Sequence, residues 1–435
     1  MDHHHAAKRR LSRLFLVYFI FSSTCTIILF HLLALPVMPF KLMPLLHGRS
    51  PAAEQALAGD RTSLADAAGG RELPSQTPVS ASPAVGDDIF PVGPLAGSGS
   101  VGANGAAPGS QAFSSGNAKV NMTWEAVYGK SPDPERLPEL DGVNVVSPTW
   151  FELSNGTGDI SSKADLDYVR WAKERNLQIW AMFSNGFEPN RTSIALSTKK
   201  SREHMIQQLL QYAETYRLQG INFDFENVKT DDGENFVQFI KEASPLLREC
   251  NLVVSVDVTP KSDSEYWSLF LDRPALIPYV DFMMLMAYDE HWASSPKSGS
   301  VASLPWVRRS VERLLDEDGI PPSKIVLSMP LYTRVWTETP KSSGGSKVTS
   351  KALGMKKAAE LVAARKLNPT YDRKTGQNYV EYREDGQLKR IWLEDSTSIK
   401  ARVALANEYG LAGVATWSRS FMDSGIWNVI KKELE

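Results

Sequence analysis

Cysteine is scarce in this chain, and its scarcity limits the folds that the chain can form. The 435 residues include 2 cysteines, Cys25 and Cys250. Cys25 lies within an apolar run and Cys250 beside a predicted helix end, so we do not expect them to pair. Two cysteines exclude a disulfide framework and a cysteine-rich zinc site. The sequence therefore predicts a fold that is stabilised by its hydrophobic core.

The chain has no excess of basic residues over acidic ones. Lys and Arg total 48 and Asp and Glu total 50, which leaves a net charge of −2. Nucleic-acid-binding domains usually carry a strong basic excess or a basic stripe, so we expect no nucleic-acid partner. His291 has no partners at metal-ligand spacing in the sequence. The sequence implies neither a metal nor an organic cofactor.

The N-terminal part carries a long apolar run behind a basic segment. Residues 1–13 are basic, and residues 14–35 contain no Lys, Arg, Asp or Glu. As a helix, residues 14–35 would extend about 33 Å, enough to cross a bilayer. A cleaved signal peptide has a shorter apolar core and a small-residue cleavage site, so we favour an uncleaved transmembrane signal anchor over secretion after cleavage. The basic segment should stay in the cytoplasm, which makes the membrane a partner and places the rest of the chain outside the cell membrane.

Residues 41–117 have few aromatic side chains. Phe90 and Phe113 are their only aromatic residues, while Gly, Ala, Ser and Pro dominate. Such a segment cannot bury enough apolar surface to offset the entropy lost on ordering. We therefore predict a disordered tether that leads to a folded domain over residues 119–435.

After Ala118, short apolar runs alternate with amphipathic helical patterns. The predicted helices include residues 163–174, 201–216, 235–247 and 304–316. Strands alternating with helices indicate parallel βαβ units, and eight such strands fit an α/β (β/α)₈ TIM barrel. The eight predicted strands cover residues 120–127, 142–151, 177–183, 220–225, 252–258, 280–287, 324–331 and 411–417.

A segment between the seventh strand and its helix exceeds what the barrel needs. Residues 337–396 contain strand-like runs at 378–383 and 388–393, so we expect a small α+β insertion. Without it, the folded part approaches the ~250 residues typical of this barrel. The alternative, an open doubly wound sheet, calls for a glycine-rich phosphate loop after the first strand, and the sequence has none there.

The fourth predicted strand carries acidic residues at the end where such barrels are catalytic. The sequence reads QGINFDFE from Gln219 to Glu226. Side chains alternate along a strand, so Asn222, Asp224 and Glu226 should point into the barrel and the phenylalanines toward the helices. Carboxylates inside a barrel are costly unless they are solvated, paired or used. A buried ion pair or a capping role is the alternative to our interpretation of Asp224 and Glu226 as catalytic.

These residues resemble the fourth-strand signature of glycoside hydrolase family 18, Asp-x-x-Asp-x-Asp-x-Glu. Asp224 and Glu226 match its last two acids, whereas Gln219 and Asn222 stand at its first two positions. The resemblance implies that Glu226 is the catalytic acid. It also implies that Asp224 holds the acetamido N–H of the substrate and that Tyr288 hydrogen-bonds to the acetamido oxygen.

Three further motifs resemble the family in the expected order along the chain. Residues 286–289 (MAYD) are similar to Met-x-Tyr-Asp, and residues 330–336 (PLYTRVW) to Pro-x-Tyr-Gly-Arg-x-Trp with Thr333 in place of glycine. Residues 413–418 (GVATWS) resemble the tryptophan floor of the family. The insertion also stands where many members carry a small α+β subdomain, so the resemblance covers all of residues 119–435.

The resemblance implies further contacts with a glycan. Trp417 is expected to stack under a sugar ring, although tryptophan is more often part of a core. Asp289 either orients the site or caps the next segment, and Tyr288 is alternatively an ordinary half-buried tyrosine. The residues expected to bind substrate are Trp417, Asp289, Asn222, Tyr332, Trp150 and Asn185.

Within the family, three segments resemble bacterial spore germination and cortex-lytic N-acetylglucosaminidases, which act on peptidoglycan. These segments are residues 145–151, 220–228 and 288–292. We therefore expect a membrane-tethered, outward-facing retaining glycosidase whose partner is peptidoglycan or another glycan that contains N-acetylglucosamine. The alternatives are a chitinase that acts on chitooligosaccharides and a non-catalytic glycan-binding scaffold.

Overall fold

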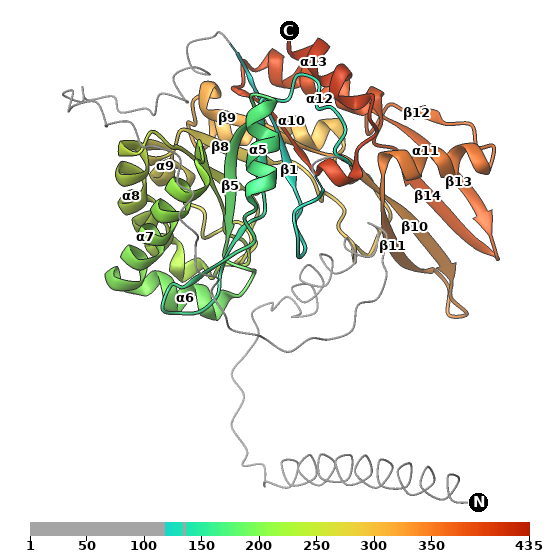
Figure 1. The fold of residues 1–435 in the computed structure, drawn as a ribbon. Helices are drawn as coiled ribbons and strands as arrows, with labels where there is room; N and C mark the ends of the chain where they lie inside the picture. Colours follow the sequence, from blue (N-terminus) through green and yellow to red (C-terminus); the bar gives the residue numbers. More distant parts are fainter. Residues whose placement is uncertain (1–117, 134–135) are drawn as a thin grey trace, which may run out of the picture. The chain divides into compact units, whose positions relative to one another are not determined.

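The computed structural model describes residues 118–133 and 136–435 (Figure 1). Within these residues, no helix is both long and apolar enough to cross a membrane. The expected cytoplasmic segment, membrane anchor and tether over residues 1–13, 14–35 and 41–117 lie outside the described residues, and they stay predictions.

Eight parallel strands form a closed barrel. Around the barrel they follow the order β1, β2, β5, β6, β7, β8, β9 and β15, and the ring closes because β15 pairs with β1 and β2 pairs with β5. Each of the eight predicted runs coincides with one of these strands to within a few residues at either end, so the predicted barrel is confirmed. The strands are β1 (Val120–Glu125), β2 (Val145–Pro148), β5 (Gln178–Ser184), β6 (Gly220–Asp224), β7 (Val253–Val258), β8 (Phe282–Met286), β9 (Ile325–Pro330) and β15 (Gly413–Trp417).

The second predicted strand ends earlier in the barrel than expected. β2 stops at Pro148, where the amide of Trp150 donates to the Pro148 carbonyl over 2.8 Å and turns the chain. The chain then forms β3 (Phe151–Leu153), which pairs in parallel with β5 and antiparallel with β4 (Ile160–Ser162). This short hairpin extends the sheet at the catalytic end of the barrel.

Helices surround the barrel (Figure 1). Several of them begin at a polar side chain that accepts hydrogen bonds from the first turn: Asp165 precedes α5, Thr198 precedes α7 and Asp395 forms a capping box at α12. These caps satisfy amide groups that have no partner within the helix. The helices outside the insertion are α5 (Leu166–Glu174), α6 (Pro189–Ser197), α7 (Lys199–Tyr216), α8 (Gly233–Glu249), α9 (Arg273–Leu276), α10 (Leu304–Asp316), α12 (Ser396–Glu408) and α13 (Ile426–Leu434).

The outward face of β6 packs against α8, as its alternation predicts. The ring of Phe223 lies 5.7 Å from that of Phe239, and the ring of Phe225 lies 5.2 Å from that of Phe236. Such aromatic contacts contribute about 0.5–1.5 kcal/mol each beyond their buried area. This packing fixes the register of β6 and turns the alternate residues toward the barrel axis.

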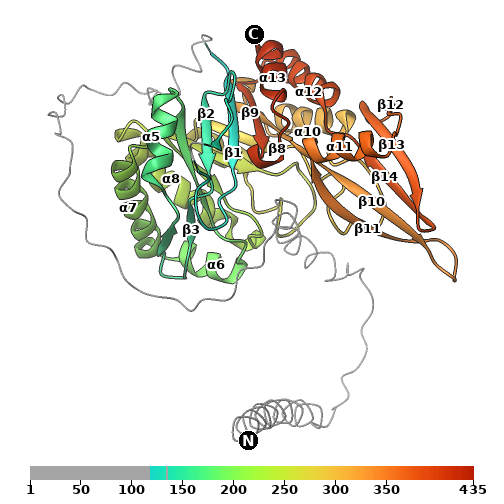
Figure 2. The same ribbon diagram turned by 45° about the vertical axis from the view of Figure 1, so that its right-hand side comes forward.

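The insertion forms a separate five-stranded antiparallel sheet. Its strand order is β11-β10-β14-β13-β12, and Figure 2 shows it to one side of the barrel. It begins at Tyr332, earlier than the expected 337, because Tyr332 already pairs with Gly354 in the β10–β11 ladder. Its elements are β10 (Tyr332–Pro340), β11 (Ser346–Gly354), α11 (Met355–Ala364), β12 (Thr370–Asp372), β13 (Gln377–Glu384) and β14 (Gln387–Trp392).

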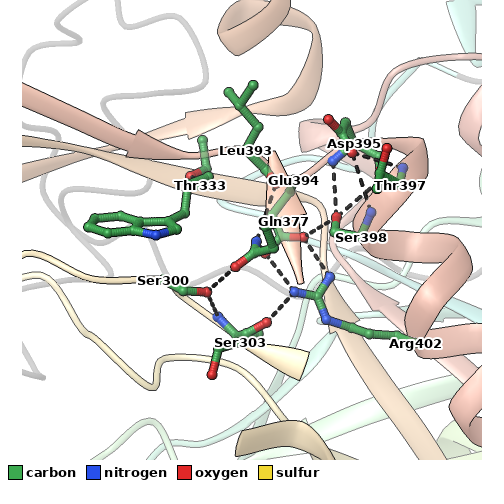
Figure 3. Close-up of polar contacts among 12 residues, drawn as sticks. Ser300, Ser303, Thr333, Gln377, Leu393, Glu394, Asp395, Thr397, Ser398 and Arg402 are labelled. Atoms are coloured by element: carbon green, nitrogen blue, oxygen red, sulfur yellow. Dashed lines mark hydrogen bonds and ion pairs between the residues drawn. The ribbon is translucent and has the colours of Figure 1, made fainter. Parts of the chain in front are cut away.

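A buried polar cluster joins the insertion to the barrel helices (Figure 3). Glu394, just after β14, forms an ion pair with Arg402 of α12, and its carboxylate also accepts from Ser398 and Gln377. Both side chains of the ion pair are at most 1% exposed. Gln377 in turn contacts Ser300, in the loop before α10. The insertion is therefore fixed to the barrel by matched charges and hydrogen bonds.

Candidate active site

The motif residues are brought together at the carboxyl ends of the barrel strands. Asp224 ends β6, Tyr288 follows β8, Tyr332 follows β9 and Trp417 ends β15. Because all eight strands are parallel, these ends lie at the same rim of the barrel. Residues far apart in the sequence thus form one candidate site, as the motif order predicts.

Asn222 lies at the centre of a hydrogen-bond network inside the barrel and is fully buried. Its side-chain oxygen accepts from Trp124 Nε1 over 2.9 Å and from Ser147 Oγ over 3.3 Å. Its amide nitrogen donates to Ser255 Oγ over 3.0 Å and to Asp257 Oδ1 over 2.7 Å. Asn222 was expected to bind substrate, but the structure places it below the rim, where it connects β1, β2, β6 and β7.

Asp224 and Glu226 differ in exposure. Asp224 is 1% exposed, whereas Glu226 is half-buried just beyond the strand. A carboxyl group that reaches the surface of the site can deliver a proton to a bound substrate, and a buried one can act on charge that develops close by. The structure therefore separates the two acids in the way that their expected roles require.

Asn185 holds the backbone of Glu226. The side-chain oxygen of Asn185 accepts from the Glu226 amide over 3.1 Å, and its amide nitrogen donates to the Glu226 carbonyl over 2.8 Å. Asn185 is fully buried and also donates to Thr192 Oγ1. Both ends of its amide are engaged with protein groups in this structure, which gives Asn185 a positioning contact, and its expected contact with substrate stays a prediction.

The chain after β8 is held by residues of β10. The hydroxyl of Tyr332 donates to Asp289 Oδ1 over 2.6 Å, and the Arg334 guanidinium lies 3.6 Å from the same oxygen. Burial and the charge of Asp289 raise the pKa of the Tyr332 hydroxyl, which keeps it a donor. Of the two roles considered for Asp289, these contacts favour orienting the site, since it ties the segment that carries Tyr288 to the insertion.

Two tryptophan rings pack against each other at the carboxyl end of β15. The rings of Trp124 and Trp417 are 6.0 Å apart and tilted, and 9% of Trp417 is exposed. Behind them, the Arg419 guanidinium pairs with the buried carboxylate of Glu125. Burial raises the pKa of Glu125, and Arg419 opposes that effect. This pair connects the end of β1 to the segment that follows Trp417.

Trp150 lies in the core rather than at an exposed subsite. It is 1% exposed, and its indole nitrogen donates to Ser131 over 3.1 Å. Its ring packs edge-on to Tyr168 of α5 and against Tyr216 of α7. The turn after Pro148 sends the side chain outward between helices, so the expected sugar contact of Trp150 is not formed in this conformation.

Sequence reasoning missed Asp257 and Trp124. Asp257 is 2% exposed near the carboxyl end of the predicted run at 252–258, and Trp124 is fully buried in the first strand. The available signal was period-two alternation, which places Ser255 and Asp257 on one face of their strand. The alternation could therefore have identified the carboxylate of Asp257 as pointing into the barrel. Its contact with Asn222 depended on the barrel register.

Within residues 118–133 and 136–435, no group of His, Cys, Asp or Glu side chains is arranged to hold a metal ion. A comparison with protein-family models matches residues 124–423 to glycosyl hydrolases family 18. The chain belongs to glycosyl hydrolase family 18. It is accordingly a glycoside hydrolase, and all four motifs at the barrel rim lie within the matched residues.

The curated proteins that are similar to this chain include enzymes whose names describe the lysis of cortical fragments. An uncharacterized glycosylase of Bacillus subtilis, YvbX, is 27% identical over 334 residues, which cover 74% of this chain and 94% of that protein. A cortical fragment-lytic enzyme of B. subtilis is 26% identical over 260 residues, which cover 57% of this chain and 59% of that protein. The resemblance to cortex-lytic members of family 18 is thereby confirmed.

Solved structures share the fold. The spore cortex-lytic enzyme SleL of Bacillus megaterium has a TM-score of 0.65 and 23% identity, with 73% of this chain and 74% of that chain covered. A putative chitinase domain from Desulfitobacterium hafniense has a TM-score of 0.65 and 24% identity, with 73% of this chain and 100% of that chain covered. At these identities the likeness shows the family 18 barrel.

Proposed function

We propose that the chain hydrolyses β-glycosidic bonds at N-acetylglucosamine in peptidoglycan, with retention of configuration and with assistance from the substrate. The observation that carries this proposal is the pair of acids at the end of β6, with Asp224 buried and Glu226 half-buried. The Asn185 amide fixes the backbone of Glu226 at the rim. This arrangement supports Glu226 as the general acid that protonates the leaving oxygen.

The geometry of β6 supports a nucleophile supplied by the substrate. Asp224 is the last residue of β6 and Glu226 follows two residues later, so their Cα atoms are at most about 6.6 Å apart. Retaining enzymes with a carboxylate nucleophile place two carboxyl groups about 5–5.5 Å apart on opposite sides of the bond. Two acids that follow one another at the end of the same strand cannot flank a sugar in this way, and Asp224 is also buried.

The 2-acetamido oxygen of the substrate can attack the anomeric carbon instead. In that step the glycosidic bond breaks, the leaving oxygen takes the proton of Glu226, and an oxazolinium ion forms. Water then adds to the anomeric carbon and returns a proton to Glu226, which gives net retention. In this scheme Asp224 stabilises the positive charge near the acetamido nitrogen and Tyr288 contacts the acetamido oxygen.

Peptidoglycan is preferred as the substrate because of the related enzymes. The names of the B. subtilis and B. megaterium relatives describe enzymes that lyse cortical fragments or spore cortex. A chitinase is the second candidate, since structural neighbours include chitinases. A non-catalytic scaffold is disfavoured because Asp224 and Glu226 are both present. With peptidoglycan as substrate, the catalytic domain acts outside the cytoplasm.

Incubation of the full chain with purified peptidoglycan and with chitooligosaccharides tests this proposal. Mass analysis of the released fragments should find N-acetylglucosamine at new reducing ends from peptidoglycan, and the first product anomer observed by NMR should be the retained one. A thiazoline mimic of the oxazolinium ion should inhibit the reaction. De-N-acetylated glycan should resist cleavage. Efficient cleavage of that glycan, or an inverted first product, would contradict the mechanism.

A further inference from the structure

Two buried carboxylates occupy neighbouring strands inside the barrel. Asp224 is 1% exposed at the end of β6, and Asp257 is 2% exposed in β7. In the parallel pairing of these strands Asn222 lies opposite Ser255. Asp224 comes two residues after Asn222, and Asp257 comes two residues after Ser255. Both side chains therefore point inward, from neighbouring strands about 4.8 Å apart. Their acidic groups therefore lie at the same level of the barrel.

The orientation of Asn222 fixes how Asp257 is held. The indole N–H of Trp124 can only donate, so it must face the side-chain oxygen of Asn222, which also accepts from Ser147. The amide nitrogen must then face β7, where it donates to Ser255 and to Asp257 Oδ1. Both N–H groups and both acceptor positions of the amide are used. Asn222 thus has one orientation, and in it Asp257 is the acceptor.

The surroundings of the two carboxylates decide how many protons they carry. The register partner of Asp224 on β5 is Ser184, and that of Asp257 on β8 is Met284. Both register partners are neutral. The titratable side chains at or just beyond the strand ends are Glu226, Tyr288, Asp289 and Tyr332, and Glu125, which pairs with Arg419. Two ionised carboxylates side by side away from water repel each other, so such a pair retains one proton.

We propose that Asp257 shares a proton with Asp224 and that Asn222 holds it in place, so that β7 supplies the second carboxylate of the catalytic centre. The consequence for turnover rests on the proposed function. As positive charge develops on the acetamido group, the O–H bond at Asp224 breaks and an O–H bond at Asp257 forms, which leaves Asp224 as the anion beside the substrate. Asp257 is then a positioning residue that acts through Asp224.

Substitutions that exchange the amide of Asn222 and the carboxylate of Asp257, made singly and together in the full chain, test this proposal. Asp257→Asn should lower kcat at least about tenfold, the equivalent of one pKa unit, with little change in KM and a shifted pH profile. Asn222→Asp alone should also be impaired, because it places a third carboxylate beside the pair. The double variant Asn222→Asp/Asp257→Asn should recover most of the kcat that Asp257→Asn loses.

The recovery has a physical basis. A carboxylate at position 222 accepts from Trp124 and Ser147 as the amide oxygen does, and an amide at position 257 supplies the donor between the strands. The matched control is Asp281→Asn, which neutralises a buried carboxylate that pairs with Arg248 outside the barrel interior. This control should lose stability but keep the wild-type pH profile. Wild-type kcat and pH profile in Asp257→Asn, or a double variant no better than Asp257→Asn, would overturn the proposal.

Infrared difference spectra of the substrate-free protein give a second measurement that does not depend on turnover. At neutral pH, the spectrum of wild type minus Asp257→Asn should contain a protonated carboxyl band, and so should that of wild type minus Asp224→Asn. Loss of carboxylate bands alone from both variants would show two ionised groups and overturn the proposal. If the protonated band is present but the protein releases no fragments from any glycan, the proposed function fails while the shared proton stands.

Discussion

Two buried polar regions of this molecule handle charge differently. Where the insertion meets the barrel helices, the carboxylate of Glu394 is matched by the guanidinium of Arg402, and Ser398 and Gln377 complete its hydrogen bonds. Inside the barrel, the carboxylate of Asp257 accepts instead from the neutral amide of Asn222. In the first arrangement burial raises the pKa of Glu394, and the Arg402 charge opposes that effect and fixes the geometry of the carboxylate. In the second arrangement this donor is uncharged, and the proposed proton sharing with Asp224 depends on this difference.

The comparison shows that the partner of a buried carboxylate decides which property the carboxylate affects. A buried carboxylate with a matched cation is costly to break, since removal of one partner leaves an unpaired charge. A buried carboxylate beside a neutral donor and another acid keeps a pKa that its neighbours can move. We therefore expect substitutions in the first region to change stability and those in the second to change turnover, and the following predictions test this division.

The largest expected effect is the loss of turnover in Glu226→Gln. Glutamine keeps the shape and a hydrogen bond but cannot deliver a proton, so the rate should fall by about 10²–10⁴-fold. Binding of glycan, measured by calorimetry, should be largely retained. The control is Glu317→Gln, which removes an exposed carboxylate paired with Arg313 and should leave turnover unchanged. A near-normal rate in Glu226→Gln would assign the general acid to another residue.

The next effect is a loss of stability in Glu394→Gln. The change leaves the Arg402 guanidinium buried without its charge partner, which costs about 3–5 kcal/mol. Urea unfolding should show this loss, while kcat per folded molecule stays close to wild type. A Glu394→Gln variant with normal stability and impaired kcat would break the division between the two regions.

A smaller effect is expected at the contact that positions Glu226. Asn185→Ala leaves the amide and carbonyl of Glu226 without their side-chain partner, and a buried group left unsatisfied costs about 1–3 kcal/mol. Because the displaced residue is the proposed general acid, kcat should fall more than KM changes. Thr192→Val, which removes a partner of Asn185 but keeps both contacts of Asn185 with Glu226, serves as the control and should be milder. Equal losses in both variants would mean that Asn185 acts only through the packing of its loop.

The smallest effect concerns the ion pair between two outer helices. Arg202 of α7 donates to both carboxylate oxygens of Glu242 of α8, and this contact lowers the pKa of Glu242. A depressed folded-state pKa gives stability above the unfolded value of 4.5, and that stability is lost as the pH falls. Glu242→Gln should therefore lower the melting temperature at pH 7 by the equivalent of about 1 kcal/mol or less. The difference from wild type should shrink at acid pH, and a constant difference would contradict this linkage.

The sequence predicted the barrel well because its signals are local. Apolar runs such as residues 252–258 are buried on both faces, so each is recognisable without knowledge of its neighbours. The same alternation correctly turned Phe223 outward and Asn222 inward. The start of the insertion was missed, because Tyr332 to Trp336 read equally well as the end of a barrel strand or as the first half of β10.

Local sequence patterns did not predict which side chains of the candidate site are exposed to solvent. Trp150 and Asn185 carry side chains that often contact sugars, yet both are buried in the structure. The direction of Trp150 depends on the turn at Pro148 and on the rings of α5 and α7. The partner of Asn185 is the backbone of Glu226, which belongs to a different strand. No spacing within one segment encodes either contact.

The sequence by itself determined where the eight barrel strands lie, which faces of those strands are apolar, and that Asp224 and Glu226 stand at the carboxyl end of β6. These properties follow from side-chain chemistry and the two-residue period of a strand. Tertiary structure decided that Asp257 meets Asn222 and that Glu394 meets Arg402. Such pairs depend on strand register and helix docking, which bring groups from distant parts of the chain within hydrogen-bond distance, and burial then gives each contact its energy.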